Sequence, residues 1–158
     1  MKNKTLKLIS ARVKRNRTEK IINQKAKREI KKWVLRKGYL DRDKGLEETA
    51  VEFGLAPEQL AHFCSSVLGE PFLSLRKRLR IEEAKRILKN EPDTPYAVAG
   101  ARAGIWNKSN FRTQFREMTG MSPAEFRRYN SSPKLKRIIR KLNVRHFIRH
   151  TSFWRCNP

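Results

Sequence analysis

The fold is decided by residues 104–127, which read GIWNKSNFRTQFREMTGMSPAEFR. A helix is predicted over residues 108–119, because apolar side chains recur there at the spacing of a single helical face. Asn107 is a residue type favoured at a helix N-cap, and Gly120 can adopt the left-handed backbone that ends a helix. The side chains expected to face inward are Phe111, Phe115 and Met118.

Further helices are predicted on both sides of this one. Downstream, Ser122 and Glu125 have the spacing of a capping box with a proline between them, which marks the start of a short helix over 122–130. Upstream, Pro95 opens another short helix, so residues 95–120 are predicted to form a helix-turn-helix unit.

The same arrangement recurs earlier in the chain. A long linker helix is predicted over 71–90, since Pro71 opens a segment whose apolar residues keep close to helical spacing. Residues 46–70 contain two shorter segments of this kind, separated by a turn at Gly54, and predict a first helix-turn-helix unit. Strand-like alternation is absent from the sequence, so the predicted fold class is all-α, with two helix-turn-helix subdomains joined by a long linker helix.

Basic arms flank this module of residues 46–130. The chain carries a net charge of +23, from 38 Lys and Arg against 15 Asp and Glu. Residues 1–45 contribute +13 and residues 131–158 contribute +8, whereas the module contributes only +2. Within the N-terminal arm, apolar periodicity predicts a helix over residues 18–38, and residues 1–17 are predicted to be flexible.

A charge of this size points to a polyanionic partner, such as nucleic acid, a ribosome or an anionic membrane surface. No apolar run reaches the roughly 18 residues that a membrane-spanning helix needs, and no signal-peptide core is present. Cys64 and Cys156 form no disulfide framework, which favours a cytoplasmic location. The sequence contains no phosphate-binding glycine loop, nucleophile motif or carboxylate pair, so neither an enzyme nor a cofactor is predicted.

The C-terminal tail leaves several interpretations open. Residues 134–142 predict a basic amphipathic helix, which would lie on an anionic membrane, along phosphates or against the module itself. His146, His150 and Cys156 are residue types that bind zinc, but a fourth ligand is missing, so no metal site is predicted.

Two segments carry a resemblance to a known family. RIEEAKRIL at residues 80–88 follows its pattern closely, and residues 104–127 keep its Ser, Phe, Gly and Pro positions. Over about residues 46–128 the chain resembles the DNA-binding domain of the AraC/XylS family of bacterial transcription regulators. With residues 33–40 included, it is most similar to the versions common in Bacteroidetes. The resemblance implies that two recognition helices enter successive major grooves on one face of DNA.

The resemblance places the two recognition helices at residues 58–68 and 108–119. Side chains that hydrogen-bond to base edges or phosphates are concentrated on the second helix. The candidate DNA-binding residues are Asn107, Lys108, Ser109, Asn110, Arg112, Thr113 and Arg116 in the second unit, and Glu58, Gln59 and His62 in the first.

The two helix-turn-helix units differ in net charge. Residues 46–75 hold five acidic side chains and no Lys or Arg, a net charge of −5, whereas residues 96–130 carry +4. The second unit is therefore expected to dominate DNA reading. Arg112 is the foremost candidate base reader, because arginine with guanine is the commonest specific pairing between protein and DNA.

Several side chains and segments outside the recognition helices also carry expectations. Gly100 should cost about 1 kcal/mol relative to alanine, so the helix that holds it is predicted to be loose. Trp106 could stack on a sugar or a base or pack beneath the second recognition helix, and packing is the favoured prediction. Residues 1–45 are too few and too charged to enclose a small molecule, so no effector pocket is predicted. Four cations of the linker helix could contact phosphates but are expected to face water, namely Arg76, Lys77, Arg78 and Arg80.

The predicted function is that of a sequence-specific regulator of transcription that binds double-stranded DNA, with RNA polymerase as a further candidate partner. The alternative is a truncated or degenerate relative that has lost sequence reading. Such a protein would act as a non-specific basic binder of nucleic acid or a membrane surface, and the acidic first unit motivates this alternative.

Overall fold

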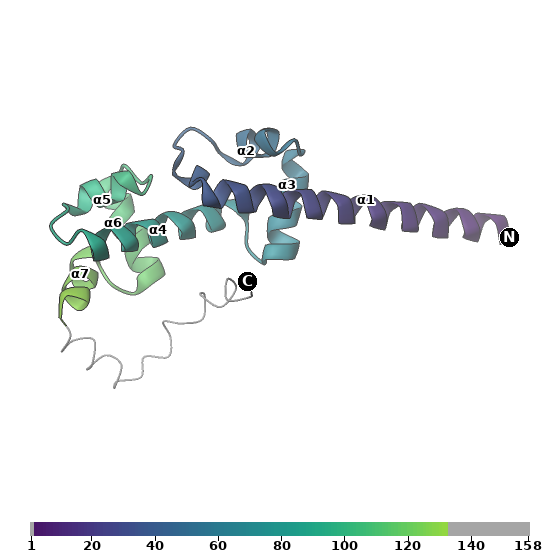
Figure 1. The fold of residues 1–158 in the computed structure, drawn as a ribbon. Helices are drawn as coiled ribbons and strands as arrows, with labels where there is room; N and C mark the ends of the chain where they lie inside the picture. Colours follow the sequence, from purple (N-terminus) through teal and green to yellow (C-terminus); the bar gives the residue numbers. More distant parts are fainter. Residues whose placement is uncertain (1, 133–158) are drawn as a thin grey trace. The chain divides into compact units, whose positions relative to one another are not determined.

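The computed structural model describes residues 2–132, with side chains from residue 12 onward, and is helical without a strand in this range (Figure 1). The all-α prediction is confirmed. The chain divides into two compact units, Met1–Arg76 and Lys77–Pro158. The elements in chain order are α1 (Lys2–Leu35), the 3-10 turn η1 (Gly38–Leu40), α2 (Leu46–Phe53), α3 (Pro57–Phe63), the π-helical turn η2 (Cys64–Leu68), α4 (Phe72–Asn90), α5 (Tyr96–Arg102), α6 (Lys108–Thr119) and α7 (Pro123–Ser131).

The core of the first unit is built around the indole of Trp33, which is 1% exposed. Ring centroids lie 6.0 Å away at Tyr39, 6.5 Å away at Phe53 and 5.5 Å away at Phe72. Ala26 and Ile30 are buried on the same face of α1. The C-terminal half of α1 is therefore an integral part of the first helix-turn-helix unit.

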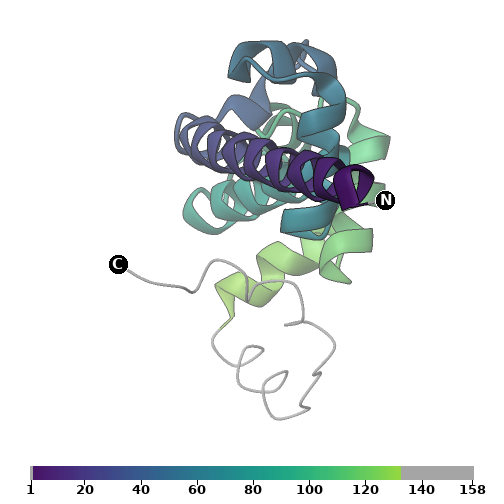
Figure 2. The ribbon, with the colours of Figure 1, turned by 90° about the vertical axis from the view of Figure 1, so that its right-hand side faces the viewer.

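The prediction of a flexible arm over residues 1–17 is wrong, because α1 begins at Lys2. No Gly or Pro interrupts this segment, and its many Lys, Arg and Leu residues are good helix formers. The prediction required an apolar stripe, which a helix surrounded by solvent does not need. Side chains 12–20 are all exposed, and Figure 1 shows these turns extending beyond α3, while Figure 2 shows the N-terminal end of α1 facing the viewer.

The core of the second unit confirms the predicted α6 and most of its inward face. Phe111 and Phe115 are fully buried, with ring centroids 5.5 Å apart, and Phe115 lies 5.4 Å from Phe126 of α7. Met118 is 40% exposed, so the prediction that it faces inward is wrong. The buried row instead continues four residues on at Thr119, whose hydroxyl donates to the Phe115 carbonyl at 2.7 Å.

Gly100 allows α5 to approach α6 closely. A Cβ atom at this position would lie 2.7 Å from Cγ of Phe111, which is shorter than real side-chain contacts. The buried glycine therefore reflects tight packing between α5 and α6, while the predicted looseness of the support helix stays a prediction.

The cations at the start of α4 are half-buried, which contradicts the prediction that they face water. Arg76 donates to the backbone carbonyls of Asp41 and Arg42, both in the first unit. Lys77 forms an ion pair of 2.6 Å with Glu117 within the second unit. Arg78 and Arg80 also interact with other residues of the protein. Arg76 and Lys77 therefore stabilise the fold, because each places its charge on a protein acceptor.

Within residues 2–132 the structure holds neither a helix long and apolar enough to cross a membrane nor a group of metal-ligating side chains. The predicted amphipathic helix of residues 134–142, and His146, His150 and Cys156, lie outside the described residues.

Candidate nucleic-acid interface

Helix α6 presents a polar face directly opposite its buried phenylalanines. Its N-terminus is capped as predicted, with the side chain of Asn107 accepting from the Asn110 amide at 2.8 Å. The amphipathic pattern fixes one face of the helix in the core and leaves the other in solvent. The seven candidate residues of the second unit are all exposed, namely Asn107, Lys108, Ser109, Asn110, Arg112, Thr113 and Arg116, and so are Glu117 and Met118 in the last turn of α6.

Some side chains of this face already form hydrogen bonds within the protein, and others do not. Asn107 caps the helix, and the Asn110 amide oxygen accepts from the Gln114 side chain at 2.6 Å. Among the described residues, Arg112, Thr113 and Arg116 have no hydrogen bond or ion pair from their side chains, and the same holds for Lys108 and Ser109. The cations of α6 are therefore available to an external acceptor.

Trp106 lies immediately before this cap and is 63% exposed, so the prediction that it packs beneath α6 is wrong. Its neighbour Ile105, only 6% exposed, fills that place in the core. An exposed indole next to the exposed cations of α6 adds a flat apolar surface that can stack on a sugar or a base.

Helix α3 offers fewer free groups than α6. The Gln59 side chain accepts from the Ala56 amide at 3.0 Å and so helps to cap its own helix. His62 Nε2 lies 3.6 Å from Glu19 Oε1 of α1. Glu58, in the first turn of α3, is exposed and has no hydrogen bond or ion pair from its side chain among the described residues, but it carries the charge that repels phosphate. The predicted helix of residues 58–68 also changes to π-helical hydrogen bonding at Cys64.

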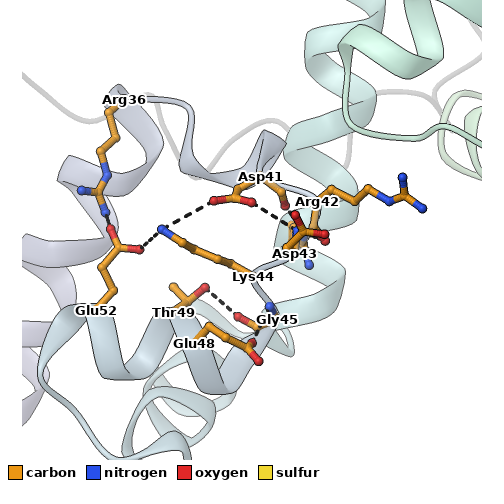
Figure 3. Close-up of polar contacts among 10 residues, drawn as sticks. Arg36, Asp41, Arg42, Asp43, Lys44, Gly45, Glu48, Thr49 and Glu52 are labelled. Carbon is orange, nitrogen blue, oxygen red and sulfur yellow. Dashed lines mark hydrogen bonds and ion pairs between the residues drawn. The ribbon is translucent and has the colours of Figure 1, made fainter.

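Two acidic side chains of the first unit, Glu52 and Glu48, are compensated within the unit. Figure 3 shows Glu52 between Arg36 and Lys44, with the Lys44 pair at 3.0 Å. Glu48 accepts from the Gly45 amide at 2.7 Å, and hydrogen bonds from backbone amides lower the pKa of its carboxyl. Over residues 1–76, 18 Lys and Arg face 9 Asp and Glu, a net charge of +9. The −5 counted for residues 46–75 therefore does not describe the folded unit.

Sequence reasoning missed these ion pairs because their members are separated by 8 to 16 positions in the chain. A signal was nevertheless present. The predicted helix over residues 18–38 has an apolar face that must be buried against a neighbour. Packing of this face also brings the cations on the other faces of the helix close to the rest of the unit.

Comparison with known proteins identifies the same module. The family model described as a helix-turn-helix domain matches residues 49–129, about half of the chain. The arabinose operon regulatory proteins of Salmonella typhimurium and Escherichia coli are each 37% identical to the chain over 73 residues, which is 46% of this chain. The match spans only 26% and 25% of the length of these two relatives.

Solved structures support the same assignment. The C-terminal domain of AraT, a response regulator from Geobacillus stearothermophilus, is 26% identical with a TM-score of 0.59, over 68% of this chain and 84% of that one. The C-terminal domain of the response regulator yesN from Fusobacterium nucleatum has the same fold, with 22% identity and a TM-score of 0.59, over 65% of this chain and 97% of that one. These relatives are regulators rather than enzymes. The chain therefore belongs to the AraC/XylS family of helix-turn-helix transcription regulators and contains the family's double-stranded DNA-binding domain.

Proposed function

We propose that this chain is a cytoplasmic regulator that recognises a specific DNA sequence chiefly through α6. The observation that carries the proposal is the unpaired, exposed Arg112 on a capped amphipathic helix. Its guanidinium can donate two hydrogen bonds to a guanine edge, a pairing worth about 1–3 kcal/mol of discrimination. Ser109 and Thr113 add hydroxyl groups on the same exposed face, and Lys108 and Arg116 add charges for the flanking phosphates.

The first unit has a smaller role in reading bases under this proposal. Two of its three candidate side chains, Gln59 and His62, already have partners, and the third is the acidic Glu58. Helix α3 would enter a major groove and fix the register of the protein, while α6 supplies most of the discrimination.

Selection of double-stranded DNA from a random pool tests this function. The wild-type chain is expected to enrich one motif and to bind it at least about 10³-fold more tightly than unrelated duplexes at moderate salt. The Arg112→Ala variant, selected in parallel, should lose information at one base position and keep the rest.

A non-specific binder is the alternative outcome of the same selection. It would bind all duplexes equally and lose affinity steeply with salt. The acidity that motivated this alternative is partly offset inside the folded first unit, where Arg36 and Lys44 pair with Glu52, and this supports the sequence-reading function.

A further inference from the structure

The exposed half of α1 carries a charge that the protein itself does not balance. Residues 12–20 hold five cations and one acid, all exposed. The first turn of α1 contains no acidic residue to offset the helix dipole, and like charges three or four positions apart destabilise a helix. A polyanion bound along this segment would relieve both effects.

A groove runs between this part of α1 and the first recognition helix. On the α1 side it is lined by Asn16, Glu19, Lys20, Asn23, Gln24 and Lys27. The opposite wall is formed by Phe63 at the end of α3 and Val67 of η2. Glu19 also reaches His62, so α1 lies directly beside the face that α3 would present to DNA.

The polar lining of α1 has a regular spacing. Asn16, Lys20, Asn23 and Lys27 follow one another at four, three and four positions and so share one side of the helix. Lys20 and Lys27 are about 10 Å apart along the axis, which matches the rise of three nucleotides of one DNA strand. The amides between them can donate hydrogen bonds to phosphate oxygens.

We propose that this side of α1 binds the phosphate backbone flanking the groove that α3 enters. Lys20 and Lys27 provide the charge, and Asn16 and Asn23 provide neutral donors. The inference rests on the proposed function, since it requires α3 to lie in a major groove. In this arrangement α1 supplies the phosphate contacts of the first unit, because α3 has no Lys or Arg to supply them.

Duplex DNA fits this surface better than a membrane does. A helix that lies on a membrane needs an apolar face to insert. Among residues 12–27, the exposed large aliphatic side chains are Val13 and Ile21 alone, too few to form such a face. The groove also adjoins a recognition helix, so a DNA duplex would meet both surfaces at once.

The test compares two double variants of the full chain on the DNA selected by the wild type. Lys20→Gln with Lys27→Gln removes the groove cations, and Lys14→Gln with Arg17→Gln removes the same charge from exposed positions outside the groove lining. Glutamine preserves helix propensity, and circular dichroism verifies that α1 persists. The groove variant should reduce the salt slope of binding by about 1.8 and weaken binding on the order of tenfold at 0.1 M salt. The control pair should change both values much less.

Phosphate ethylation interference gives a second readout on the same duplexes. Ethylation of a few phosphates beside the α3 site should weaken the wild type and have no further effect on the groove variant. Equal losses in the two double variants would overturn the inference and leave sequence-specific binding intact, as would binding of the groove to anionic vesicles without any effect on DNA affinity. A wild type without sequence preference would instead contradict the proposed function itself.

Discussion

The expected effect of replacing Gly100 by alanine differs between an isolated helix and the folded unit. In an isolated helix, alanine at this position would be favoured by about 1 kcal/mol. In the folded unit, the added Cβ would meet the Phe111 ring at 2.7 Å. Helix propensity is a local property, whereas this contact depends on a residue 11 positions away, and so it was not predictable from the sequence.

We expect Gly100→Ala to destabilise the protein by about 1–3 kcal/mol, because overpacking a dense core forces side chains or backbone to move. Urea unfolding followed by circular dichroism measures this difference. Ala97→Gly, at an exposed position of the same helix, is the control and should lose about 1 kcal/mol through propensity alone. An increase in stability for Gly100→Ala would show that the contact between α5 and α6 can accommodate the added methyl group.

Trp106 should report DNA binding directly. In a Trp154→Phe background, acrylamide should quench the exposed Trp106 and leave the buried Trp33 nearly untouched. Addition of the selected duplex is expected to protect Trp106, because the indole would then lie against the DNA. The matched variant Trp106→Phe, in the same background, should show no such protection. Unchanged quenching on DNA binding would place Trp106 away from the interface.

At the scale of elements, helices with a strong local signal were predictable. Helix α6 and the capping box of α7 follow from the sequence because cap and apolar row act within a few residues. The full length of α1 was not predictable, since a solvent-exposed helix has no apolar periodicity in its sequence. The change to π-helical bonding at Cys64 also has no signature in the residues themselves.

The capping box of α7 makes the stability of the second unit depend on pH. The Ser122 side chain accepts from the Glu125 amide, and Glu125 accepts from the Ser122 amide at 2.7 Å, which lowers the pKa of this carboxyl. A lowered folded-state pKa means that the stabilisation is present above the unfolded value near 4.5 and is lost as pH falls through the folded value.

We therefore expect Glu125→Gln to be less stable than the wild type at pH 7 and equal to it at strongly acidic pH, measured by thermal unfolding across this range. Ser122→Ala removes the other half of the box and should cost about 0.5–2 kcal/mol. Its cost should change less with pH, because the serine hydroxyl does not titrate. A constant difference between wild type and Glu125→Gln down to pH 3 would contradict the assigned role of the carboxylate.

At the scale of the whole molecule, charge must be assigned to folded units rather than to segments. The sequence correctly indicates a polyanionic partner, a helical fold and the family. It misplaces the charge of the first unit, because Arg36 and Lys44 reach Glu52 across the fold. The candidate site was predictable in its second half, where local amphipathicity separates exposed Arg112 from buried Phe111.

The most direct test of the account is the affinity of single variants for one selected duplex at one salt concentration. Arg112→Ala should lose about 1–3 kcal/mol, and His62→Ala well under 1 kcal/mol, since Arg112 can meet a guanine edge with two hydrogen bonds. Arg128→Ala, an exposed arginine of α7, is the matched control for the loss of one charge and should change little. Equal losses for Arg112→Ala and His62→Ala would contradict the central claim that α6 carries most of the sequence discrimination.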